Sequence, residues 1–233
     1  MQRLFDIIFA TLALVVLSPL LIPISALLRL SGEGEIFFTQ SRAGKSGNFF
    51  GLFKFATMLK DSPNIGSGTV TMKDDPRILP LGGFLRKSKI NELPQLLNIL
   101  LGDMSVIGPR PLTRQTFSSY SKATQDVIKR VRPGLSGVQQ IVIRDEEVLM
   151  HGATASVSFY DSVLAPYKGE LEIWFVDNKS LYIYFLTIFM TVWIILAPKS
   201  SAVWKVFKGL PIPPNELKVP LNYISQSSFS SFK

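Results

Sequence analysis

The sequence predicts an α+β fold, in which an N-terminal re-entrant membrane helix precedes a small, mostly helical domain with a short β-hairpin and interfacial helices. Three observations lead to this prediction. An uncharged run covers residues 7–28, two strand-like segments cover 35–44 and 48–55, and apolar residues recur at helical spacing from about 92 to 101.

The composition narrows the classes of function. The 233 residues include 25 Lys and Arg against 17 Asp and Glu, a formal charge of +8. This balance suits an anionic partner, such as nucleic acid, an acidic membrane surface or a phosphorylated substrate, or it reflects only a basic solvent-exposed face. Nucleic acid is disfavoured because the aromatic residues lie in apolar runs rather than among Lys and Arg. The absence of cysteine excludes disulfides, thiol catalysis and cysteine metal sites. The single histidine, His151, excludes a multi-histidine metal site and is assigned no role.

The first uncharged run, residues 7–28, has the roughly 20 apolar residues that are needed to cross the hydrocarbon. Pro19 and Pro23 lie near its centre, where each proline removes a backbone donor and bends the helix. Ser18 can satisfy a carbonyl that the bend leaves free. We therefore expect the membrane helix to break at Ser18 and Pro19.

Cations flank both ends of this run, with Arg3 before it and Arg29, Arg42 and Lys45 after it. The positive-inside rule therefore gives no preferred direction for a crossing. A bent helix that enters and leaves on the same face fits this symmetry, so we favour a re-entrant helix over a full span. A signal peptide is disfavoured because Asp6 intrudes and no small-residue cleavage site follows.

A second uncharged run covers residues 180–198. Trp193, Trp204, Lys205 and Lys208 in and after it are typical of a lipid headgroup boundary. A buried core helix explains the run equally well, and both interpretations stay open.

The remaining chain is expected to form a compact domain. The two strands are joined by residues 45–47, and the many turn-forming residues of 60–83 indicate a long loop. Helices are expected over 119–134, ended by Pro133, and over 157–176, interrupted at Pro166 and Gly169. We divide the chain into the membrane helix at 1–30, the domain at 31–208 and a flexible tail at 209–233.

The segment KSKINELPQLLN, residues 87–98, places Asn91 and Glu92 together at the start of the helix predicted over about 92–101. Because Pro94 belongs in the first turn of a helix, Asn91 falls at the N-cap and Glu92 at the first helical position. Asn is a favoured N-cap residue, and Glu suits the positive end of the helix dipole. A structural explanation of the pair therefore exists.

Nearby cations favour a functional explanation. Arg86, Lys87 and Lys89 precede the helix start, and a helix N-terminus with such neighbours can bind phosphate. Arg110 lies between two prolines that stiffen its loop, which suits phosphate binding, although a surface salt bridge explains it as well. In DDPR, residues 74–77, a carboxylate could bind Mg²⁺, but a turn before proline is the commoner use of such a segment.

The chain resembles the bacterial sugar transferases of the monotopic phosphoglycosyl transferase family, which includes undecaprenyl-phosphate sugar phosphotransferases. The resemblance runs from about residue 2 to about residue 203 and is most specific in ELPQLLNILLGDMSVIGPRP, with RLFDIIFATLALVVLSPLL and VRPGLSGVQQ in support. It implies transfer of a sugar-1-phosphate from a UDP-sugar to a polyprenyl phosphate, with release of UMP and help from Mg²⁺. This reaction initiates synthesis of a bacterial surface polysaccharide or glycoconjugate. It also implies a location at the bacterial inner membrane, with the active site at the cytoplasmic face, and leaves open whether the chain forms a homo-oligomer.

Carried over by position, the resemblance implies that Asn91 and Glu92 are catalytic, that Glu92 is a metal ligand, and that Lys54, Arg86 and Arg110 bind substrate phosphates. The family usually has Asp, the nucleophile, where this chain has Asn91, and an amide has no anionic oxygen with which to attack phosphorus. It also usually has Arg and Asp where this chain has Ala56 and Tyr184. The chain is therefore expected to be a divergent transferase or, alternatively, a catalytically impaired homologue that serves as a membrane binding or assembly protein.

Overall fold

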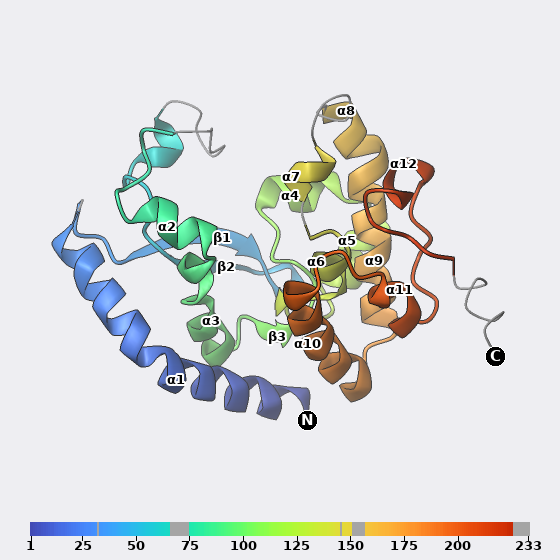
Figure 1. The fold of residues 1–233 in the computed structure, drawn as a ribbon, viewed down its shortest axis with the longest axis horizontal. Coiled ribbons are helices and arrows are strands. Elements are labelled where there is room, and N and C mark those ends of the chain that lie inside the picture. The colour runs from blue at the N-terminus through green and yellow to red at the C-terminus, as the bar shows by residue number, and fades with distance from the viewer. Residues whose placement is uncertain (32, 66–74, 145, 151–156, 226–233) are drawn as a thin grey trace. The chain divides into compact units, whose positions relative to one another are not determined.

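The computed structural model describes residues 1–31, 33–65, 75–144, 146–150 and 157–225 (Figure 1). His151, Asp74 and the last eight residues of the expected tail lie outside the described residues. The chain divides into two compact units. We call residues 3–42 and 50–104 the N-terminal unit, and residues 1–2, 43–49 and 105–233 the C-terminal unit.

The N-terminal unit contains all but the first residue of the long helix α1, Gln2–Leu30, which Figure 1 shows changing direction about half way along its length. Its apolar side chains are mostly exposed, and only 11% of its most apolar 18-residue stretch is buried. Among the described residues this helix is long and apolar enough to cross a membrane. Because it is so little buried, it differs from the core helix of a soluble protein.

The expected break at Ser18 and Pro19 is a bend within one continuous helix. Pro19 has no N–H to offer the carbonyl of Val15, four residues earlier. The Ser18 hydroxyl donates a hydrogen bond to that carbonyl at 2.7 Å, as expected for Ser18. The helix therefore passes through both prolines without an interruption, and the re-entrant path through a bilayer stays a prediction.

The β-hairpin is confirmed as β1, Phe37–Ala43, and β2, Phe49–Phe55, with the 3₁₀ turn η1, Lys45–Gly47, between them. Of the segment predicted as a long loop, residues 66–74 lie outside the described residues, and the described part contains the 3₁₀ turn η2, Ser62–Asn64, and the start of helix α2, Gly82–Lys87. The 3₁₀ turn η3, Ile90–Glu92, and helix α3, Gln95–Leu101, complete this unit.

A small apolar cluster fixes these elements to one another. Ile24 and Leu28 of α1, Phe55 of β2 and Leu85 of α2 are buried against each other. The buried faces thus hold the end of β2 and the helix α2 on the second half of α1, where burial of large aliphatic side chains stabilises the arrangement. This cluster brings β2 close to the segment that contains Asn91 and Glu92.

The C-terminal unit is built around two short parallel strands, β3, Ser105–Ile107, and β4, Gly134–Ser136, in which Ser105 pairs with Gly134. Its helices are α4 Arg114–Ser119, α5 Lys122–Ile128, α6 Val138–Val142, α7 Glu146–Leu149, α8 Val157–Phe159, α9 Ala165–Asp177, α10 Leu181–Leu196, α11 Ala202–Val206 and α12 Asn215–Lys218. A π-helical turn, Tyr160–Leu164, joins α8 to α9.

Two expected helices differ in the structure. The helix predicted over 119–134 is shorter in the structure, where it corresponds to α5, Lys122–Ile128, while α4 ends at Ser119. Ser121 caps α5 by accepting a hydrogen bond from the Thr124 N–H. The predicted interruption at Gly169 is wrong, since α9 runs through this residue. Near Pro166 the α-helical pattern is interrupted as expected, by the π-helical turn that ends at Leu164. Pro166 lies in the first turn of α9, where a missing donor is tolerated, and Gly169 allows close contact with Thr124 of α5.

The second apolar run forms α10, which is neither fully buried nor, at 16 residues, long enough to cross straight through the hydrocarbon. Tyr184 and Met190 are buried, whereas Phe189 and Trp193 are exposed. An interfacial position therefore stays the prediction that fits this helix best. Part of the expected flexible tail differs from expectation, because Leu217 is buried and the Trp204 indole donates to the carbonyl of Leu221.

Candidate active site

The polar centre of the N-terminal unit is an ion pair between β2 and the turn η3. The Lys54 Nζ lies 3.2 Å from the Glu92 Oε1, and the two side chains are 22% and 38% exposed. A pair that is half open to solvent contributes little to stability, about 0–1 kcal/mol. Its position leaves both groups accessible to a bound molecule, so the pair suits chemistry better than it suits structural support.

Asn98 of α3 holds β2 beside this turn. Asn98 is fully buried, and both the oxygen and the nitrogen of its side-chain amide form hydrogen bonds with the β2 backbone. The Oδ1 accepts a hydrogen bond from the Phe53 N–H at 2.9 Å, and the Nδ2 donates to the Gly51 carbonyl at 2.8 Å. Because these two contacts fix the strand immediately before Lys54, they determine where the lysine leaves the backbone.

The turn itself depends on two unusual backbone positions. Lys89 has a φ of 60°, in the left-handed region that non-glycine residues seldom adopt. Gly82 lies so close to the Thr57 carbonyl that an added Cβ would be 2.1 Å from its oxygen. Helix α2 therefore approaches the end of β2 closely, and the reversal at Lys89 returns the chain to place Asn91 and Glu92 next to it.

The predicted N-cap role of Asn91 is wrong. Helix α3 begins at Gln95, and Asn91 lies in the separate 3₁₀ turn η3. A cap at Asn91 would accept from residues 93 or 94, but Pro94 has no N–H and the Leu93 N–H donates to the Ile90 carbonyl at 3.1 Å. The Asn91 side chain is 8% exposed, and its Oδ1 has no hydrogen-bond partner. A buried, unpartnered oxygen costs free energy, and this cost would be offset if a bound group donated a hydrogen bond to it.

Arg86, on α2, belongs to the same unit and is partly buried. Its Nη1 lies 3.5 Å from the thioether sulfur of Met58, which is a weak acceptor. Lys54, Arg86, Asn91 and Glu92 are thus all in the N-terminal unit, on β2, α2 and η3. Cations on two of these elements suit the binding of a phosphorylated molecule.

The two candidate magnesium ligands, Asp75 and Glu92, differ in their surroundings. Asp75 of the DDPR segment forms a buried bidentate pair with Arg77, with Nε–Oδ1 and Nη2–Oδ2 distances of 2.8 and 2.6 Å. Because both of its oxygens bond to Arg77, we assign Asp75 a structural role rather than a role as a magnesium ligand. Within the described parts of the chain, no three acidic or histidine side chains come together as a metal site. Glu92 can thus offer one carboxylate ligand, which fits the way Mg²⁺ binds through one or two carboxylates together with substrate phosphates.

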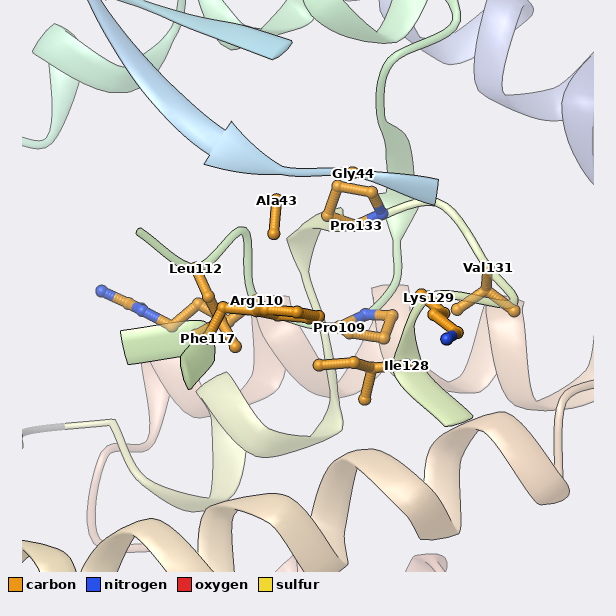
Figure 2. Close-up of a pocket in the computed structure, with 10 residues that line it drawn as sticks. All are labelled: Ala43, Gly44, Pro109, Arg110, Leu112, Phe117, Ile128, Lys129, Val131 and Pro133. Carbon is orange, nitrogen blue, oxygen red and sulfur yellow. The ribbon is translucent and has the colours of Figure 1, made fainter. Parts of the chain in front are cut away.

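Arg110 lies in the C-terminal unit, on the loop after β3. Its side chain is exposed and lines a small pocket together with Phe117 and Lys129. Figure 2 shows the guanidinium of Arg110 extending away from the other lining residues, on the side opposite Lys129. The Arg110 backbone N–H donates to the Glu172 Oε1 at 2.8 Å, so a buried carboxylate of α9 holds this loop.

Glu172 belongs to a buried polar group in the same unit. Burial raises the pKa of Glu172 to about 7, while the hydrogen bond from the Arg110 backbone and the charge of Lys168 act in the opposite direction. Lys168, one turn earlier on α9, is also buried and forms an ion pair with Glu146 at 3.0 Å. Burial raises the pKa of the nearby Tyr120 phenol as well, so that this hydroxyl stays protonated.

The two other positions at which the chain departs from the resemblance are both buried. Ala56 is 4% exposed at the end of β2, and Tyr184 is 2% exposed in α10. The Tyr184 ring packs edge-on against Phe185 at 5.4 Å. Both positions are thus occupied by residues that fill space in their own unit.

Sequence reasoning missed Asn98 and Glu172. Asn98 lies among apolar residues in the helix predicted over about 92–101, and nothing local indicates that its amide reaches a strand 45 residues earlier. The burial of Glu172 could have been predicted from the sequence pattern around it. Tyr167, Leu171 and Phe175 follow helical spacing on the buried face of α9, and the adjoining Lys168 and Glu172 are four residues apart.

The fold and this polar turn define a protein with a long exposed apolar helix and a small domain that presents cations beside a carboxylate. The family model for bacterial sugar transferases matches residues 1–198. The chain therefore belongs to the bacterial sugar transferase family.

Curated relatives agree with this membership. The chain is 37% identical to the exopolysaccharide production protein ExoY of Sinorhizobium fredii over 62% of this chain and 70% of the relative. It is 34% identical to a UDP-N-acetylgalactosamine-undecaprenyl-phosphate N-acetylgalactosaminephosphotransferase of Aeromonas hydrophila, over 84% of this chain and 43% of that protein. It is 35% identical to the UDP-glucose:undecaprenyl-phosphate glucose-1-phosphate transferase of Escherichia coli, over 81% and 39% of the two chains.

Proposed function

We propose that this protein transfers a sugar-1-phosphate from a UDP-sugar to a polyprenyl phosphate and releases UMP, as the initiating step of a bacterial surface polysaccharide or glycoconjugate. The observation that supports this most directly is the Lys54–Glu92 pair beside the buried, unpartnered Asn91 oxygen, in a chain of the sugar transferase family. The names of the relatives from Aeromonas hydrophila and Escherichia coli describe transfers of this kind for those proteins.

The proposed reaction is a displacement at the phosphorus that bears the sugar. A phosphate oxygen of the polyprenyl phosphate forms a bond to this phosphorus, and the bond from the same phosphorus to the UMP oxygen breaks. The products are a polyprenyl diphosphate sugar and UMP, so both charge and atoms balance. We propose direct attack because Asn91, an amide, cannot form the covalent phosphosugar intermediate that an aspartate could form.

Lys54 and Arg86 are proposed to neutralise the diphosphate of the UDP-sugar. Positioning and charge neutralisation account for most of the catalysis in phosphoryl transfer, so a site that has lost one nucleophile can keep part of its rate. Arg110 of the C-terminal unit is likewise proposed to bind a substrate phosphate through its planar guanidinium. Its flanking prolines reduce the entropy that the loop loses on binding.

Glu92 is proposed to be catalytic and to be the protein's carboxylate ligand for Mg²⁺. Bound Mg²⁺ would neutralise charge on the diphosphate as the leaving group departs. Glu92 also orients Lys54 through their ion pair, and the Asn91 amide lies at the adjacent buried position as a polar contact for substrate. Within the described residues, the single carboxylate offered here requires the substrate phosphates to complete the coordination.

We further propose that α1 holds the protein in the bacterial inner membrane, with the polar turn on the cytoplasmic face. The exposed apolar side chains of α1 support the membrane location. The acceptor lipid is itself a membrane component, so a domain held at the bilayer surface meets it without diffusion through water. Arg29, at the last turn of α1, suits the headgroup region at that boundary.

A second function is favoured by the amide at position 91. A catalytically impaired homologue would bind the UDP-sugar or an active partner through the same cations and turn over nothing. The two functions differ in what Asn91→Asp does. An active enzyme keeps or gains rate with the aspartate, whereas an impaired homologue stays inactive because Ala56 and Tyr184 also differ from the usual family residues.

The experiment is a transfer assay on purified protein in detergent with Mg²⁺, undecaprenyl phosphate and a panel of radiolabelled UDP-sugars. We expect lipid-linked product with one or a few sugars, and loss of that product in Glu92→Gln. Glu35→Gln, which alters an exposed ion pair with Lys60 in the same unit, is the matched control and should keep the native rate. An absence of product across the whole panel, with UDP-sugar binding retained, would establish the second function instead.

A further inference from the structure

The loop that presents Arg110 is held by its backbone at an unusual point. Its neighbours, Pro109 and Pro111, have no N–H, so the Arg110 N–H is the one main-chain donor of the Pro-Arg-Pro triplet. That donor bonds to a side chain, the Glu172 Oε1 at 2.8 Å, rather than to another main-chain carbonyl.

The rest of the loop is fixed by main-chain bonds within the C-terminal unit. The Gly134 N–H donates to the Pro109 carbonyl at 2.7 Å, and the Ala43 N–H donates to the Leu112 carbonyl at 2.8 Å. The loop is therefore held at both ends, and Glu172 supplies the remaining contact at the residue whose side chain matters.

Burying the Glu172 carboxylate at this position costs free energy. It is 1% exposed, and its Oε2 has no hydrogen-bond partner. A buried carboxylate with one bonded oxygen costs free energy that an apolar side chain of similar size would not cost. Burial raises its pKa to about 7, which is the expected sign of this cost. The charged or polar groups that act on this buried cluster are Lys168 on the same helix, Arg110 on the loop, Tyr120, Tyr160 and Glu146.

We propose that Glu172 is a positioning residue that fixes the Pro-Arg-Pro loop by its main chain and thereby aims the Arg110 guanidinium at a substrate phosphate. This inference rests on the proposed function. With both proline φ angles set and the intervening N–H bonded, the direction in which the Arg110 side chain leaves the backbone is determined. Figure 2 shows that side chain extending away from the other residues that line the pocket.

The test compares Glu172→Leu with Glu172→Gln in the transfer assay, alone and in an Arg110→Ala background. Leu keeps the volume but loses the acceptor, whereas Gln keeps an oxygen that can accept from the Arg110 N–H. We expect Leu to raise the KM for the UDP-sugar by about tenfold with a smaller change in kcat, and Gln to stay within about threefold of the native protein. Glu170→Ala, an exposed residue on the same helix, is the control and should leave the kinetics unchanged.

The Arg110→Ala background separates positioning from general support of the fold. If Glu172 acts through Arg110, Glu172→Leu should add less than about twofold to the loss already caused by Arg110→Ala. An equal tenfold loss in both backgrounds would overturn the inference. So would a tenfold rise in KM for Glu172→Gln relative to the native protein, a measurement that decides even if the Leu variant does not fold. If Arg110→Ala itself leaves KM and kcat unchanged, the role of Arg110 in the proposed function fails, separately from the role of Glu172.

Discussion

Two carboxylates, one in each unit, have opposite environments. Glu92 is 38% exposed, lies in a short 3₁₀ turn and pairs with Lys54 across 3.2 Å. Glu172 is 1% exposed, lies in the middle of α9, and bonds to a main-chain N–H through one oxygen while the other oxygen has no partner. Each carboxylate is associated with a residue proposed to bind phosphate, Lys54 in the first case and Arg110 in the second.

The difference shows that an exposed carboxylate suits a catalytic role, whereas a buried carboxylate suits a positioning role. A half-exposed carboxylate keeps its charge at neutral pH at little cost and can exchange its partner for a metal ion or a substrate. A buried carboxylate is held in one geometry, and its charge is disfavoured by desolvation. We therefore expect changes at Glu92 to alter rate with little loss of stability, and changes at buried acids to alter stability or geometry first.

The largest expected effect concerns the buried acid that is fully paired. Asp75→Ala leaves Arg77 buried without its bidentate partner, and we expect a loss of about 3–5 kcal/mol in the free energy of unfolding. Denaturant or thermal unfolding in detergent measures this loss. Asp61→Ala, at an exposed acid of the same unit, should change stability by less than about 1 kcal/mol. Equal stability losses in the two variants would contradict the distinction between buried and exposed acids.

The next effect is on rate. Glu92→Gln keeps the size of the side chain but removes its charge, and we expect the transfer rate to fall by at least about 100-fold. The unfolding midpoint should move little, because the ion pair with Lys54 is partly solvated. Steady-state kinetics and a melting curve on the same preparation measure both quantities. A fall in stability that matched the fall in rate would make Glu92 a structural residue.

A smaller effect is the pH dependence contributed by Glu172. Burial raises its pKa in the folded protein from the ordinary value of 4.5 to about 7, so the folded state binds this proton more tightly than the unfolded state does. The stabilisation is complete below about pH 4.5 and is lost as pH rises through about 7. We expect the difference in melting temperature, native minus Glu172→Gln, to become more negative between pH 5 and 8. A difference that is constant over this range, or that rises with pH, would contradict the assignment.

The smallest expected effect is on stability at Lys54. Lys54→Met should change the free energy of unfolding by less than about 1 kcal/mol, since the pair with Glu92 is 22% and 38% exposed. The same variant should raise the KM for the UDP-sugar by about tenfold, because a cation is removed from the proposed diphosphate site. Titration of the substrate in the transfer assay measures KM. An unchanged KM would remove Lys54 from the site.

Local patterns predicted much of this structure from the sequence. The hairpin follows from two aromatic-rich segments around a short turn, and the bend in α1 follows from Pro19 with Ser18 before it. These features depend on residues that are close in the chain. The cations Lys54 and Arg86 were also found by pattern and resemblance, and the structure places both in one unit with Glu92.

The rest depended on contacts between distant segments. The helix after Pro94 starts three residues later than predicted, because the chain reverses at Lys89 and its N–H groups bond within the 3₁₀ turn. Gly169 of α9 lies against Thr124 of α5, where an added Cβ would come within 3.2 Å of the threonine, and this contact between distant segments is not visible in the local sequence. Glu172 acts on a residue 62 positions earlier, so only the fold could connect it with Arg110.

The central claim is that phosphorus moves together with the sugar at a site where Glu92, with Asn91 beside it, is essential. The most direct measurement uses UDP-sugar labelled with ³²P at the phosphorus that bears the sugar, with undecaprenyl phosphate and Mg²⁺, and follows the label into the organic phase. We predict that the native chain moves the label and the sugar into lipid in equal amounts while UMP appears in water, and that Glu92→Gln does neither. Sugar in the lipid without the label, or label transfer that persists in Glu92→Gln, would contradict this account.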